Sequence, residues 1–152
     1  MSKRPPFILF GLLALVCIVA VPWIALGKNG DQDAATVKVA SRDQASKDLF
    51  ATNCGPCHTL AAAGADGVVG PNLDQLLVPS GINSAESFPA NAGRVMQAVT
   101  CGVAGRMPKG ILEEAEAKEV ATFVGAYAGQ IGKGPVVDTD DVKPPEPPST
   151  CS

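Results

Sequence analysis

Cys54-Gly55-Pro56-Cys57-His58 is the stretch of this 152-residue sequence on which both the fold and the chemistry depend. The pentapeptide is a C-x-x-C-H motif, which is the attachment signature of a covalently bound c-type haem. Two thiols three positions apart can each add to one vinyl group of a porphyrin, and the histidine that follows then lies under the iron as an axial ligand. The motif therefore predicts one haem c, attached through Cys54 and Cys57 and ligated by His58.

Two other kinds of site also use closely spaced cysteines. A thioredoxin-like redox motif accepts Gly-Pro between its cysteines, but it needs a preceding strand within a βαβ unit. Here a helical segment precedes Cys54, and no stretch of the sequence alternates like a strand. A zinc site would need more Cys or His ligands nearby, and the sequence contains one histidine. The pattern therefore favours haem over thiol redox chemistry or zinc.

The second axial ligand has to be another residue type, because His58 is the single histidine of the sequence. Of the three methionines, Met1 would lie across a membrane or be removed with a leader, and Met96 falls in a predicted helix, where packing in the core is the commoner role. Met107 lies in a loop and precedes Pro108, which restricts it to extended conformations. We therefore predict Met107 as the distal ligand. The alternative is an exposed loop methionine, with an iron that is five-coordinate or bound otherwise.

Three motifs in this order resemble the class I cytochromes c over about residues 42–129: the pentapeptide, then Gly70-Pro71-Asn72-Leu73, then Met107-Pro108. Phe50 and Phe123 resemble the family's aromatic pair where the terminal helices cross. The resemblance implies that the carbonyl of Pro71 accepts a hydrogen bond from Nδ1 of His58, which fixes the orientation of the ring. It also implies that Leu73 packs on the haem edge. Without the neighbouring motifs, the Gly-Pro pair would be taken for an ordinary turn.

The pattern around these motifs predicts an all-α haem domain of about three to four helices over residues 41–131. Ser41 and Gln44 fit a capping box that would start a helix running to about residue 53. Three further helical stretches are expected, over about residues 73–77, 90–100 and 113–128. The last of these has apolar residues at helical spacing and glutamates in its first turns, where they suit the helix dipole.

Residues 1–27 form a separate hydrophobic segment, in which residues 7–26 carry no charge. A helix of that length spans about 30 Å, the thickness of a bilayer core. Lys3 and Arg4 would keep its N-terminus in the cytoplasm. We expect one transmembrane helix in a bacterial cell membrane, a flexible linker over residues 28–40 and a periplasmic haem domain. The alternative is a cleaved signal peptide, although the apolar core of such a peptide usually has about 7–15 residues.

Residues 132–152 form a Pro-rich tail that is expected to be extended or disordered. Cys101 and Cys151 remain once the haem pair and Cys17 of the hydrophobic segment are set aside. In an oxidising compartment, an even remainder suggests a disulfide, which would pin the tail near the Met107 loop. The alternative is that Cys101 is a small buried residue and that Cys151 is free or pairs with a partner subunit.

Composition and charge restrict the classes of partner. Hydrophobic residues make up 46% and charged residues 18%, and the net charge is −3, which argues against a disordered chain and against a nucleic-acid binder. Beyond residue 27, ten Lys and Arg face fifteen Asp and Glu, a net charge of −5. Together with the haem propionates, this charge predicts docking on basic partner surfaces, at rates that fall as the salt concentration rises.

Histidine–methionine coordination would fill both axial positions of the iron, which suits one-electron transfer rather than catalysis on a bound substrate. We expect a membrane-tethered electron carrier, not an enzyme, between a quinol-oxidising donor of the quinol–cytochrome c reductase kind and a terminal oxidase or photosynthetic reaction centre. One alternative is a fixed haem subunit of a larger respiratory complex, which would co-purify stoichiometrically. Another is a haem sensor or peroxidase with an open distal site, which would bind carbon monoxide at neutral pH.

Overall fold

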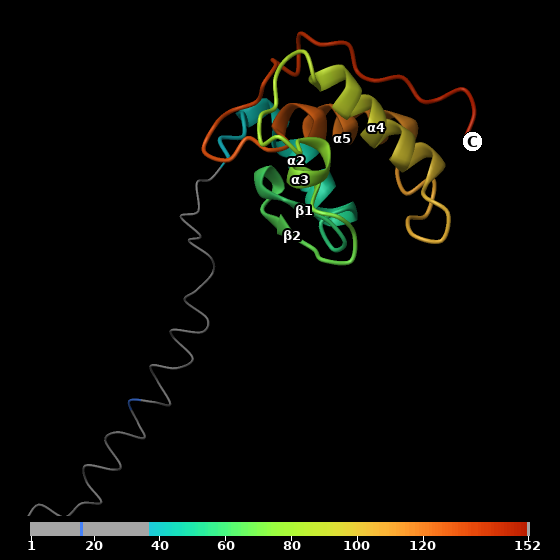
Figure 1. Cartoon of the computed structure of the whole chain (residues 1–152), viewed down its shortest axis with the longest axis horizontal. Coiled ribbons are helices and arrows are strands. Elements are labelled where there is room, and N and C mark those ends of the chain that lie inside the picture. Colours follow the sequence, from blue (N-terminus) through green and yellow to red (C-terminus); the bar gives the residue numbers. More distant parts are fainter. Residues whose placement is uncertain (1–15, 17–36, 152) are drawn as a thin grey trace, which may run out of the picture. The chain divides into compact units, whose positions relative to one another are not determined.

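The computed structural model describes residue 16 and residues 37–151. In chain order the elements are η1 (Ser41–Asp43), α2 (Gln44–Asn53), β1 (Thr59–Leu60), η2 (Ala61–Ala63), β2 (Ala65–Asp66), α3 (Leu73–Leu77), α4 (Phe88–Cys101) and α5 (Glu114–Tyr127) (Figure 1). Four α-helices provide most of the regular structure in this part of the chain, as the sequence predicts. The predicted anchor over residues 7–26 lies outside the described residues, and no helix among those described has the length and apolarity needed to cross a bilayer.

Helix α5 forms the centre of the core, and α2 and α4 pack against it (Figure 1). Its C-terminal half is buried without interruption from Val120 to Tyr127. The crossing with α4 is close because Gly125 has no side chain: a Cβ there would lie 2.9 Å from Cβ and 3.0 Å from the backbone nitrogen of Ala92. Phe50 and Phe123, which were expected where the terminal helices cross, are each 1% exposed.

Residues next to the helix determine where α5 begins, whereas distant residues influence where α2 begins. Glu113 and Glu116 form a capping box at the start of α5, where their charge also suits the helix dipole. The capping box predicted at Ser41 is wrong, since Ser41 instead opens the 3₁₀ turn η1 with no side-chain cap, and α2 begins at Gln44. Asp43, two residues after Ser41, is buried, and the side chains of Tyr127 and Thr139 donate to its carboxylate. Contacts with distant residues therefore hold the backbone at the start of α2.

The expectation that no segment forms a strand is also wrong in one place. Strands β1 and β2 form a two-residue antiparallel hairpin, in which Thr59 pairs with Asp66 and Leu60 with Ala65. Two residues are too few to show an alternating pattern, so no signal in the sequence could have revealed this hairpin.

The tail is extended, as predicted, but it is also packed on the domain (Figure 1). The backbone N–H of Val136 donates to the carbonyl of Ala126 at 3.0 Å. Three valines of the tail lie against the hydrophobic core: Val136, Val137 and Val142. The tail therefore extends the domain that was expected to end near residue 131.

Candidate functional site

The pentapeptide continues α2 as a further turn of backbone. The N–H groups of Cys54 and Gly55 donate to the carbonyl of Phe50, at 2.8 and 2.9 Å. The N–H groups of Cys57 and His58 in turn donate to the carbonyl of Cys54, at 3.0 and 2.9 Å. Both thiols and the imidazole are thus presented by one hydrogen-bonded turn. Cys54 is buried and Cys57 is exposed, and neither forms a disulfide.

The hairpin returns the chain so that residues 67–71 lie against the pentapeptide. Gly70 donates its N–H to the carbonyl of Cys57 at 2.7 Å, and the Thr59 hydroxyl donates to the carbonyl of Gly67 at 2.8 Å. A Cβ on Gly67 would lie 2.6 Å from the carbonyl carbon of Cys57 and 2.7 Å from the nitrogen of His58. Gly67 belongs to none of the sequence motifs, and nothing in the sequence shows that these two backbones touch.

The imidazole of His58 is held by one of its nitrogens. Nδ1 lies 3.0 Å from the carbonyl oxygen of Pro71, which can only accept, so Nδ1 carries the proton. Nε2 is then the nitrogen with a free lone pair, as a metal-ligating histidine requires. Gly70 adjoins the same ring, and a Cβ there would lie 2.7 Å from Nδ1 and 2.9 Å from Nε2. The site thus has the ring geometry that the family resemblance implies.

Met107 lies in a separate loop after α4. Val103 and Met107 form an isolated antiparallel bridge, with each N–H donating to the other's carbonyl at 2.9 Å. Met107 is half-buried against the core, whereas Met96 is 1% exposed within it. None of the backbone hydrogen bonds of Met107 reaches the pentapeptide. Leu73, at the start of α3, is also half-buried against the core.

These residues fit a covalently attached haem. They provide two unpaired thiols at the required spacing, an imidazole with one nitrogen already satisfied, and a thioether in a loop. At Gly67 and Gly70 the backbone lies so close to the pentapeptide that a side chain would not fit. In the chain without haem, burial, with a smaller contribution from the neighbouring Cys57, raises the pKa of the Cys54 thiol to about 11.

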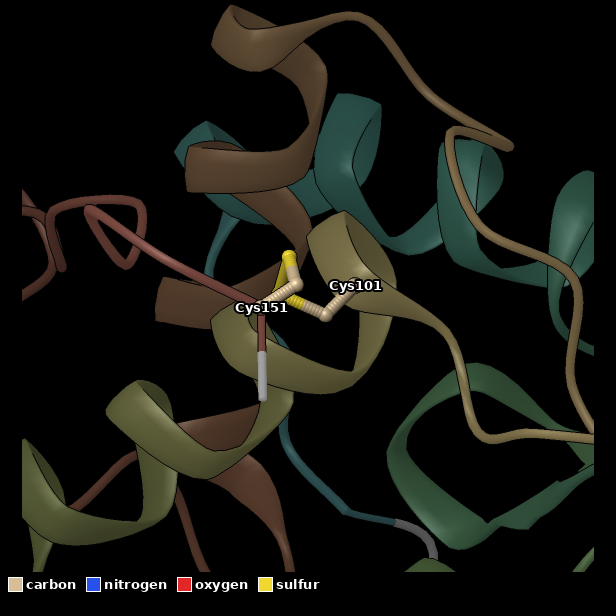
Figure 2. The surroundings of a disulfide bond; sticks show 2 residues. All are labelled: Cys101 and Cys151. Atoms are coloured by element: carbon tan, nitrogen blue, oxygen red, sulfur yellow. A yellow bond between two sulfur atoms is a disulfide. The ribbon is translucent and has the colours of Figure 1, made fainter.

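A disulfide joins Cys101, the last residue of α4, to Cys151 in the tail (Figure 2). Their Cα atoms are 5.3 Å apart, and 50 positions separate them in the sequence. Closing a loop of this size stabilises a fold by about 4 kcal/mol in the chain-entropy account. The tail is therefore covalently joined to the residue that precedes the Met107 loop.

Three buried polar side chains hold the loops around the helices, and none of them belongs to a motif that the sequence reveals. Asp43 accepts from Tyr127 Oη and from Thr139 Oγ1, both at 2.6 Å. Asp74 accepts from two backbone N–H groups, those of Ala61 at 2.8 Å and Gly129 at 2.7 Å. Asn83 donates from Nδ2 to the carbonyls of Gly125 and Ala128, at 3.0 and 2.9 Å. All three reach the C-terminal end of α5 from distant parts of the sequence.

Comparisons with known proteins identify the family of this domain. The sequence model of one family, described as Cytochrome c, matches residues 44–127, which is more than half of the chain. Among solved structures, the chain is similar to the c-type cytochrome SorU from Sinorhizobium meliloti, at 36% identity, with 63% of this chain and 99% of that chain covered and a TM-score of 0.44. A comparison with curated proteins gives no match.

Proposed function

This chain belongs to the cytochrome c family and binds haem c covalently, and from that premise we propose that it is a one-electron carrier with His58 and Met107 as axial ligands. The haem supplies the one-electron chemistry when it is bound. The protein's residues attach it and orient its histidine ligand.

The hydrogen bond between His58 Nδ1 and the Pro71 carbonyl carries the proposal. It fixes the tautomer that leaves Nε2 as the ligating atom, and it makes the ring a stronger ligand. Because the sequence has no second histidine and Met96 is enclosed in the core, a half-buried Met107 is the sulfur that remains for the opposite face. A methionine ligand favours the reduced iron and so raises the reduction potential.

The location and partners belong to the same proposal. We place the haem domain on the extracytoplasmic side, where haem c is attached and where a disulfide such as Cys101–Cys151 persists. Residues 7–26 would tether it to the membrane. Its donor would be a quinol-oxidising complex, its acceptor a terminal oxidase or photosynthetic reaction centre, and its acidic surface would dock on basic partner surfaces.

The folded tail supports a mobile carrier over a fixed subunit of a larger complex. A tail that joined a permanent complex would need free apolar residues to pack on its neighbours. Here the valines of the tail are already half-buried against the protein's own core, and Cys151 is bound to Cys101.

Replacing the proposed distal ligand tests this function. Met107→Ala is expected to abolish the weak far-red absorption band by which iron–methionine ligation shows in oxidised c-type cytochromes. It should also lower the reduction potential by on the order of 0.1 V or more, since axial ligands set haem potentials over a range of about 0.8 V. Carbon monoxide should bind the reduced variant at neutral pH.

Met96→Leu is the matched control, because it replaces a methionine of the core with a residue of similar volume. This variant should keep the far-red band and the potential of the unaltered protein. If the unaltered protein binds carbon monoxide readily, or if Met107→Ala keeps the band, Met107 is not the ligand and a sensor or peroxidase becomes the better proposal.

A further inference from the structure

We propose that the Cys101–Cys151 disulfide, with the proline-rich segment 143–150 that leads to it, is a brace that positions the Met107 loop. The two cysteines would then be positioning residues that act on the haem iron through Met107. The inference rests on the proposed role of Met107 as the distal ligand.

Hydrogen bonds and close backbone contacts join the Met107 loop to α4 next to Cys101, and Met107 itself packs against the core. Gly102 has φ of +69°, and a Cβ on it would lie 2.7 Å from the carbonyl oxygen of Met107. From there the loop closes on itself through the bridge between Val103 and Met107. Its return to the helix is one long hydrogen bond of 3.3 Å, from the N–H of Gly110 to the carbonyl of Val99. A shift of Cys101 would therefore displace the start of the loop and disturb the position of Met107.

The brace is anchored firmly at its other end. Thr139 Oγ1 donates to the buried carboxylate of Asp43 at 2.6 Å, and Asp138 forms an ion pair with Arg42 at 3.0 Å. Val142 then packs against the core. Between Val142 and the disulfide, no described residue donates or accepts a hydrogen bond to the rest of the domain. Pro145 lies beside Phe88 and Pro89 of α4, with which it lines a shallow hollow. The disulfide is the covalent attachment at the far end of this segment.

The composition of the segment makes it stiff enough to hold a position. Four of its residues are prolines, at 144, 145, 147 and 148. Proline fixes φ, and runs of this kind adopt an extended polyproline helix with a rise of about 3.1 Å per residue. Lys143 and Glu146 also form an ion pair within the segment, at 2.6 Å. A flexible tether would only limit how far Cys101 could move, whereas a stiff one fixes where it lies.

The effect of the brace can be measured as the ease with which an added ligand displaces Met107 from the iron. In the oxidised, haem-loaded full chain, imidazole competes with the Met107 sulfur for the iron, so its apparent affinity reports the fraction of molecules whose methionine is detached. Cys101→Ser/Cys151→Ser should raise the apparent affinity for imidazole about tenfold, followed as loss of the far-red band. Pro147→Gly/Pro148→Gly, which keeps the disulfide but softens the segment, should raise it by a smaller factor.

Val120→Ala is the control for stability alone, because it removes buried side-chain volume from α5 and leaves the disulfide and the Asp43 anchor in place. It should lower the unfolding midpoint and leave the imidazole affinity unchanged. The brace is refuted if the serine variant binds imidazole as the unaltered protein does, or if Val120→Ala raises the affinity as much. Absence of the far-red band in the unaltered protein would instead refute ligation by Met107, and the brace with it.

Discussion

At the scale of single residues, Gly70 illustrates how the histidine is held. Gly70→Ala would place a Cβ within 2.7–2.9 Å of both ring nitrogens of His58, far inside van der Waals contact. The ring would have to turn, which would weaken its hydrogen bond to Pro71. We expect an altered haem absorption spectrum and a loss of stability of about 1–3 kcal/mol, measured by denaturant unfolding.

Gly93→Ala is the matched control for this substitution. Gly93 lies within α4, and a Cβ on it would meet nothing within 4 Å. The spectrum should be unchanged, and stability should rise by up to about 1 kcal/mol, because alanine favours the helix. An unaltered spectrum in Gly70→Ala would mean that the ring does not lie where the structure places it.

The residues that carry chemistry could be identified from the sequence, whereas the residues that support them could not. Cys54, Cys57 and His58 form a contiguous motif whose spacing is dictated by the porphyrin. Gly67 supports the same motif from nine positions beyond His58, and only the folded hairpin shows that its lack of a side chain matters. Asn83 is similar, since its partners on α5 are more than forty positions away.

At the scale of elements, the crossing of α4 and α5 depends on Gly125. Alanine has the higher helix propensity by about 1 kcal/mol, so local preference alone favours Gly125→Ala. The added Cβ would nevertheless meet the backbone of Ala92 at 3.0–3.1 Å and push the helices apart. We expect a net loss of about 1–3 kcal/mol in the free energy of unfolding, with the haem spectrum retained. Stabilisation like that expected of Gly93→Ala would contradict the close crossing.

The longer helices follow from sequence because their signals are local. The apolar residues that indicate α5, and the glutamates at its start, all belong to the helix or to its N-terminal cap. The bounds expected for α3, residues 73–77, are the observed ones. The sequence pattern predicts a capping box at Ser41, whereas α2 begins at Gln44 after a 3₁₀ turn in which Asp43 is bound by Tyr127 and Thr139, more than eighty positions away. The β1–β2 hairpin was missed because each strand has two residues.

At the scale of the whole molecule, the Asp43 carboxylate joins the beginning and the end of the domain through Tyr127 and Thr139. Burial, followed by the hydrogen bond to Asp43, raises the pKa of Tyr127 from 10.0 to about 12. The folded state thus holds the phenolic proton more tightly than the unfolded chain does. This contribution to stability is fully present below pH 10 and is lost as the pH rises from about 10 through 12.

Tyr127→Phe should therefore be less stable than the unaltered protein by about 1–3 kcal/mol at neutral pH, because Asp43 and the N–H of Ala40 each lose a partner. The difference should shrink between pH 10 and 12, as measured by urea unfolding across that range. A difference that stays constant over this interval would show that Tyr127 does not titrate with a raised pKa.

The sequence by itself determined the chemistry of this protein: a covalent haem at Cys54 and Cys57, the single histidine beside them, and a helical domain, because each of these follows from neighbouring residues or from composition. The tertiary structure alone decided which glycines must lack a side chain, where the buried polar groups find partners, and that the tail packs on the domain and not away from it. Those features depend on which distant backbones come within a few ångströms of one another. Such contacts are set by the packing of the entire core, and no local stretch of residues encodes them.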